Sequence, residues 1–282
     1  GTMVGLFNMA QPLGVGVGIM LAGHLAAQFG WRAVFGMLAL PGVVLGLLML
    51  FAPDYKTRRV DAAGSIGFKP GLRATLAYIA GNRTLQFIYL AQLPIAVYIM
   101  TCGIWGPTLF VRQYQLSLAD AASMVGLITI FAGFGALCGG WLSDRVSRGN
   151  PGARVTICLL YLGVPLVLHS VCFIGSMVGF PLWAVVAAFS VGQFFAAANW
   201  GTLVAASLDQ SPPPYRAACQ SFLPMFQAIA GLGAGVISGL LSARLGLPMT
   251  MEILLVFGML SAIALLYVAR RHYDEDYRRQ GV

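Results

Sequence analysis

The chain has 282 residues, of which 59% are hydrophobic and only 9% are charged, and its formal net charge is +8. Soluble globular domains carry about 25% charged residues, so the composition excludes a soluble protein and indicates an integral membrane protein. The basic residues lie in short loops between apolar runs and do not gather with aromatic residues on one polar face, which argues against a nucleic-acid-binding protein.

Two apolar runs open the chain, at residues 4–27 and 33–52. Each is long enough to cross a hydrocarbon core of ~30 Å as a helix. The first carries Gly14 and Gly18, with Gly23 one residue out of phase, and this ladder of small residues predicts the close approach of another helix. No signal peptide is visible. The chain starts abruptly inside this helix, so we expect it to be a fragment of a longer protein.

A basic segment, residues 53–83, follows the second run. Its Lys and Arg residues outnumber its two acids and are Lys56, Arg58, Arg59, Lys69, Arg73 and Arg83. Leu72, Leu76 and Ile79 recur at helical spacing, so we expect a short helix on the membrane surface. The change in composition predicts a linker between two helical bundles.

Six more apolar spans follow the linker. They occupy residues 85–111, 121–143, two parts of 155–208, a span opened by Tyr215-Arg216, and residues 249–269. Ser117 and Asp120 form a capping box before the second of these spans, and glycines at 175 and 179 divide the long run. The next-to-last span carries a further ladder, Gly231, Gly235 and Gly239. The predicted fold is an all-α membrane protein with eight transmembrane helices.

The basic residues also predict the orientation of these spans. Of the 17 Lys and Arg residues, all but Arg32, Arg112 and Arg244 lie in the even-numbered connections and the C-terminal segment. Positively charged loops face the cytoplasm. We therefore expect a multi-pass protein of the plasma (inner) membrane, with the linker and the C-terminus in the cytoplasm.

A charged turn ends the run 121–143. From Gly140 through Asp144 and Arg145 to Arg148 it reads G-x-x-x-D-R-x-x-R. This pattern resembles the cytoplasmic turn between paired helices in the major facilitator superfamily of secondary transporters, although Ser147 stands where that family usually has glycine. The resemblance implies that the eight spans are the last eight of twelve helices, and that the first four are missing.

Several short stretches resemble the Spinster branch of that superfamily, among them Asn150-Pro151-Gly152-Ala153 and Asn199-Trp200. That branch often has an acid in its eleventh helix, and residues 229–233 have none, which weakens the inference of a lipid-like substrate. The resemblance implies four parts: the last two helices of the N-terminal half (1–52), a basic cytoplasmic linker with a short surface helix (53–83), the six-helix C-terminal half (84–270) and a cytoplasmic tail (271–282).

In this superfamily the first and fourth helices of each half line a central cavity. Here those helices carry polar and aromatic residues on one face each, within an arc of ~80° for the first helix. These residues are Tyr98, Thr101, Trp105 and Thr108 on the first helix, and Ser190, Gln193 and Trp200 on the second. Asn199, next to Trp200, is a further candidate cavity residue. Hydroxyl, amide and indole groups suit a small neutral or amphipathic solute. The alternative is that they bond to one another between helices.

The charged turn is a candidate conformational gate, formed by Gly140, Asp144, Arg145 and Arg148. The resemblance places Asp144 against the first residues of the first span, Gly1 to Gly5, where a helix N-terminus attracts an acid. Arg145 and Arg148 would keep the acid ionised. The alternative is a solvated turn that only fixes the topology.

The sequence thus predicts a secondary active transporter that moves a small organic solute, amphipathic or lipid-like, by alternating access. None of the nine acids falls in the middle of a span, so a coupling proton or ion would use an acid on the missing helices. The alternative is a complete eight-helix scaffold or partner subunit without transport activity. Enzyme motifs, metal-ligand clusters and cofactor motifs are lacking, and we expect a monomer in the lipid bilayer.

Overall fold

The computed structural model describes residues 2–52, 71–150 and 152–279. The helices of this described part are α1 (Thr2–Phe29), α2 (Trp31–Met49), α3 (Leu72–Gly81), α4 (Arg83–Tyr114), α5 (Leu118–Ser147), α6 (Ala153–Val178), α7 (Leu182–Asp209), α8 (Arg216–Leu245) and α9 (Leu247–Arg278). All except α3 are long and apolar enough to cross a membrane. The prediction of eight transmembrane helices is confirmed.

Local signals set several helix boundaries. The Ser117 hydroxyl accepts a hydrogen bond from the Asp120 backbone N–H at 3.1 Å and caps the start of α5, as the capping box predicts. Gly30 separates α1 from α2 and Gly246 separates α8 from α9, with φ angles of 77° and 79°. Since only glycine adopts this left-handed region freely, each turn can be one residue long.

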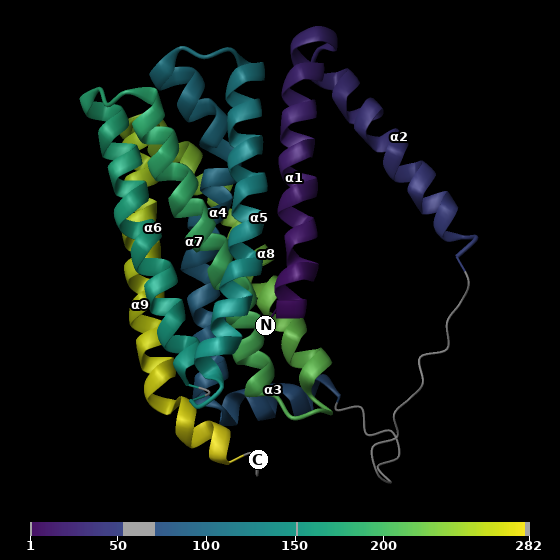
Figure 1. Cartoon of the computed structure of the whole chain (residues 1–282), viewed down its shortest axis with the longest axis vertical. Coiled ribbons are helices and arrows are strands. Elements are labelled where there is room, and N and C mark those ends of the chain that lie inside the picture. Colours follow the sequence, from purple (N-terminus) through teal and green to yellow (C-terminus); the bar gives the residue numbers. More distant parts are fainter. Residues whose placement is uncertain (1, 53–70, 151, 280–282) are drawn as a thin grey trace.

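Helices α4 to α9 form one bundle, α1 runs along its side, and α2 diverges from it (Figure 1). Within the bundle, α4 packs on α8 and α9, α7 packs on α5 and α6, and α6 packs on α9. The short helix α3 lies across one end of the bundle, which we call the linker end (Figure 1). There α4, α6 and α8 begin and α5, α7 and α9 end.

Helix α1 packs against α5 through glycines. A Cβ atom at Gly16 would lie 2.6 Å from the Gly126 carbonyl oxygen, and Gly23 is in equally close contact with Ala122. Of the predicted ladder, Gly23 makes the expected close contact, but Gly14 and Gly18 do not, because open space surrounds them. The alternating glycines of this stretch fit two registers, and the packing selects the one through Gly16.

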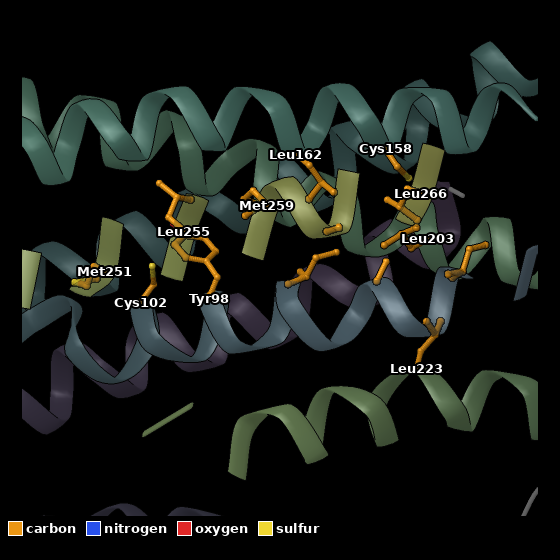
Figure 2. Close-up of a cluster of buried hydrophobic side chains, with 14 of the residues drawn as sticks. Tyr98, Cys102, Cys158, Leu162, Leu203, Leu223, Met251, Leu255, Met259 and Leu266 are labelled. Atoms are coloured by element: carbon orange, nitrogen blue, oxygen red, sulfur yellow. The ribbon is translucent and has the colours of Figure 1, made fainter. Parts of the chain in front are cut away.

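The core of the bundle lies between α4 and α9. Tyr98 and Cys102 from α4 meet Met251, Leu255 and Met259 from α9 (Figure 2). All five cysteines are free thiols and, except for Cys138, are buried. They act as small core residues, as their place in apolar runs predicts.

The linker helix α3 packs on the bundle by one side. Thr75 and Ile79 are buried, whereas Leu72 and Leu76 are exposed, so the three predicted apolar positions divide between two faces. The rest of the predicted basic linker, residues 53–70, lies outside the described residues. The predicted tail continues α9 as a helix to Arg278, and Asp276 within it is buried and accepts hydrogen bonds from Thr84.

Candidate functional site

Two of the predicted cavity residues lie inside the bundle. Tyr98 and Thr101 are fully buried. The Tyr98 hydroxyl bonds to Nδ1 of His169 on α6, and the Thr101 hydroxyl donates to the Val97 carbonyl at 2.8 Å. These residues are buried because of the way α4 is rotated in the bundle: the face that carries Tyr98 packs against Gly258 of α9. These two hydroxyls therefore stabilise the bundle rather than line a cavity, contrary to the expectation.

Trp105 lies where α4 meets α8. It is half-buried, and its indole Nε1 donates to the Ser238 hydroxyl at 2.7 Å. A Cβ atom at Gly239 would be in ordinary van der Waals contact with the Trp105 ring. The second glycine ladder thus makes room for large α4 side chains, and Trp105 is positioned between two helices.

The predicted residues of α7 divide into two groups. Ser190, Gln193 and Trp200 are half-buried, so the other helices cover this face only in part. Asn199 is 2% exposed, and its Oδ1 atom has no hydrogen-bond partner among the described residues. The structure thus places three residues on an accessible stripe of α7 and the fourth inside the bundle.

An ion-pair cluster joins the ends of three helices at the linker end. Arg154 of α6 pairs with Asp144 of α5 at 3.0 Å and with Asp209 of α7 at 2.7 Å. The same guanidinium donates to the Ser143 hydroxyl at 3.2 Å. Because the Arg154 side chain is only 14% exposed, this cluster is better shielded from solvent than an ordinary surface ion pair.

The bases expected beside Asp144 have other positions. Arg145 lies over the Trp141 ring at 5.5 Å, and Arg148 is exposed. Successive residues of a helix point in different directions, so closeness in sequence to Asp144 does not bring these bases to it. The expected contact of Asp144 with residues 1–5 involves side chains outside the described residues.

Gly140, the remaining gate residue, is buried in α5 beside a tight seam with α7. A Cβ atom at the preceding Gly139 would lie 2.6 Å from the Cα atom of Ala198. Such contacts let the two backbones approach closely. The glycines before the charged turn therefore hold Asp144 near the end of α7.

Two functional candidates, Arg154 and Asp209, were missed by the sequence reasoning. Both lie at helix ends that the distribution of bases assigns to the same side as Asp144, so the topology contained the signal. Glu252 near the other end of the bundle accepts a hydrogen bond from Ser170 at 2.8 Å. Among the described residues, no group of three or more His, Cys, Asp or Glu side chains could hold a metal ion.

Comparison with known proteins identifies the family. Residues 1–180 match the Major Facilitator Superfamily. The chain belongs to this superfamily. The match covers the charged turn from Gly140 to Arg148 and the cluster partner Arg154.

Several transporters of the superfamily are similar in sequence. The hexuronate transporter of Bacillus subtilis is 23% identical over 178 residues, 62% of this chain and 42% of the transporter. A probable sphingolipid transporter of Arabidopsis thaliana, spinster homolog 3, is 26% identical over 53% of this chain and 35% of that protein. The gallate transporter of Pseudomonas putida is 26% identical over 92% and 61%. The chain thus spans about one third to three fifths of these relatives.

Solved structures of the superfamily share the fold. A bacterial homolog of the human lysosomal transporter Spinster, in an inward-facing and unoccupied conformation, has a TM-score of 0.59 at 17% identity, covering 96% of this chain and 67% of that structure. The fucose:proton symporter of Escherichia coli also has a TM-score of 0.59, at 16% identity, over 88% and 55%. The major-facilitator helix arrangement is therefore shown for this chain.

Proposed function

We propose that the protein containing this chain is a secondary active transporter of a small organic solute, working by alternating access. The observation that carries the proposal is the combination of family membership with an accessible polar stripe on α7, formed by Ser190, Gln193 and Trp200. The related proteins named above are transporters of sugar acids, gallate and, with a probable assignment, sphingolipid. Neutral hydroxyl, amide and indole groups support an organic solute rather than a metal ion.

In this proposal α4 and α7 form the C-terminal wall of the solute cavity. Trp105 contributes its indole ring at the α4–α8 contact, and the α7 stripe contributes polar groups. The opposite wall would be formed by the first and fourth helices of the N-terminal half, which are among the four that the resemblance places before α1. A coupling proton or ion, if the transporter uses one, would bind to an acid there, and the linker end would face the cytoplasm.

The Arg154 cluster serves as a positioning device for the gate. By pairing with Arg154, Asp144 is fixed at the linker end of α5, where it can meet the start of α1. An acid near a helix N-terminus gains ~0.3–1 kcal/mol when exposed and up to ~2 kcal/mol when partly buried. Since ~1.4 kcal/mol changes a population tenfold, this contact is strong enough to favour a closed linker end.

Solute counterflow in proteoliposomes tests the proposal. The intact protein is reconstituted and loaded in turn with hexuronate, galactarate, hexose phosphate, gallate or sphingosine, and uptake of the same labelled solute from outside is measured. A transient accumulation above equilibrium for at least one solute supports a carrier. Its absence for all of them, with folded protein in the membrane, would favour the alternative of a scaffold or partner subunit.

A further inference from the structure

A buried histidine joins three helices of the bundle. His169 of α6 is fully buried. Its Nδ1 atom is bonded to the Tyr98 hydroxyl of α4, and its Nε2 atom lies 3.3 Å from the Phe189 carbonyl oxygen of α7. The main packing partners of α6 are α7 and α9, and those of α4 are α8 and α9. The imidazole therefore ties α4 to α6 and α7, although α4 packs mainly on other helices.

The two contacts fit a neutral imidazole with its proton on Nε2. A carbonyl oxygen only accepts, so Nε2 is the donor to Phe189. A neutral ring then has an acceptor at Nδ1, which matches the Tyr98 hydroxyl as a donor. The rings of Phe189 and Phe173 lie beside the imidazole, with centroids 5.1 Å and 6.1 Å away. In these apolar surroundings, one orientation of the ring satisfies both nitrogen atoms.

Helix α7 makes room for this ring at a glycine. A Cβ atom at Gly192 would clash with Nε2 of His169 and lie 2.6 Å from its Cδ2 atom. Ser190 and Gln193 of the accessible stripe directly follow Phe189 and Gly192 in the sequence. Because successive residues of a helix are rotated by about 100°, His169 holds the side of α7 that adjoins the stripe.

On α4 the same ring fixes the face that carries Trp105. Tyr98 and Trp105 are seven residues apart, which is close to two helical turns, so both side chains lie on one face of α4. A rotation of α4 that moved Trp105 would therefore break the bond between Tyr98 and His169.

We infer that His169 is a positioning residue, which fixes the rotation of α7 relative to α4 and thereby the distance between the α7 stripe and Trp105. It acts through Tyr98 and the α7 backbone and does not itself touch the solute. The groups of a binding site must be held within about 0.5 Å of their productive positions, so the relation of these two helices sets the affinity. This inference rests on the proposed function, because it takes the stripe and Trp105 as parts of the solute cavity.

The concentration dependence of transport tests this role in the intact protein. Counterflow is measured with whichever solute named above the wild-type protein accumulates. His169→Phe keeps a ring but removes both bonds, so it should raise KM about tenfold, with a maximal rate per folded protein within about threefold of the wild type. A residue that only stabilised the fold would lower the amount of folded protein and leave KM unchanged.

Three further variants provide a rescue, a partial loss and a control. His169→Gln restores an acceptor for Tyr98 and a donor for the Phe189 carbonyl, so KM should stay within about threefold of the wild-type value. Tyr98→Phe removes one of the two bonds and should raise KM about 2- to 10-fold; it replaces His169→Phe in both assays if that variant does not fold. His24→Phe changes an exposed histidine of α1 and should leave KM unchanged.

Distances between spin labels test the same inference without transport. The labels are placed at Ile104 of α4 and Val191 of α7, which are both exposed, in a background where Cys138 is replaced by serine. The distance distribution should broaden or shift in His169→Phe. It should match that of the wild type in His169→Gln and in His24→Phe.

The two assays separate failure of the inference from failure of the proposed function. Transport with an unchanged KM in His169→Phe and Tyr98→Phe, or unchanged distances, would overturn the positioning role while leaving the transporter proposal intact. If the wild-type protein transports none of the solutes, the proposed function fails, and the distances alone decide whether His169 fixes α7 against α4.

Discussion

Arg154 is the single residue that ties three helix ends together. Replacing it with leucine removes both ion pairs and leaves Asp144 and Asp209 to repel each other. We expect Arg154→Leu to lower the free energy of unfolding by about 1–3 kcal/mol, between the values for exposed and buried pairs. It should also broaden the distances between spin labels at Leu6 and Gly149.

The exposed Arg148 provides the control for this variant. Arg148→Leu removes the same charge from the same turn and should leave both the melting curve and the spin-label distances near those of the wild type. If the two variants behave alike, net charge at the turn matters and the Arg154 cluster does not.

At the scale of residues, the sequence predicted which side chains matter better than it predicted which side chains they contact. The turn from Gly140 to Arg148 led to the correct family, yet the base paired with Asp144 is Arg154. Likewise Tyr98 and Thr101 were expected in a cavity and are buried. Helical spacing gives the relative directions of side chains on one helix, but the rotation of that helix against its neighbours depends on packing that the spacing does not contain.

At the scale of elements, the contact between α1 and α5 rests on the register of its glycines. Gly16→Val should clash with the α5 backbone and destabilise the protein by about 1–3 kcal/mol, a typical cost of overpacking. Gly14→Val adds the same side chain two residues earlier, where open space surrounds the glycine. Thermal melting of the two variants should therefore differ; equal melting temperatures would contradict the register through Gly16.

The linker helix α3 is held to the bundle by Tyr78. Its hydroxyl donates to the Gln210 carbonyl at 2.7 Å, and its ring stacks on Tyr215. Burial raises the pKa of Tyr78 to about 12, so the hydroxyl remains a donor at neutral pH. Losing this bond costs ~0.5–1.5 kcal/mol, and hydrogen exchange of the α3 amides should become about 2- to 10-fold faster in Tyr78→Phe. Tyr277→Phe should leave that exchange unchanged, and unchanged exchange in Tyr78→Phe as well would rule out Tyr78 as the anchor.

At the scale of the whole molecule, the orientation in the membrane can be measured directly. In a background where the exposed Cys138 is replaced by serine, a cysteine at Arg148 should react with a membrane-impermeant reagent only from the cytoplasmic side. A cysteine at Gln113 should react only from outside. The reverse pattern would invert the topology that the basic residues predict.

The number and bounds of the spanning helices could be predicted because each requires a long apolar run, and loop residues such as Gly30 and Ser117 interrupt those runs. Which face of each helix is buried could not be predicted, since a helix that is apolar all round has no amphipathic pattern to mark its buried face. The choice between Gly14 and Gly16 shows this limit, because both registers carry glycine and only the packing of α5 separates them.

Alternating access is the central claim, and Gln193 tests it most directly. This half-buried residue lies on the accessible stripe of α7. In the same Cys138→Ser background, a cysteine at position 193 of the intact protein should react with impermeant reagents applied from either side. A saturating transported solute should slow both reactions. Reaction from one side only, with no effect of solute, would contradict a cavity that opens alternately to the two sides of the membrane.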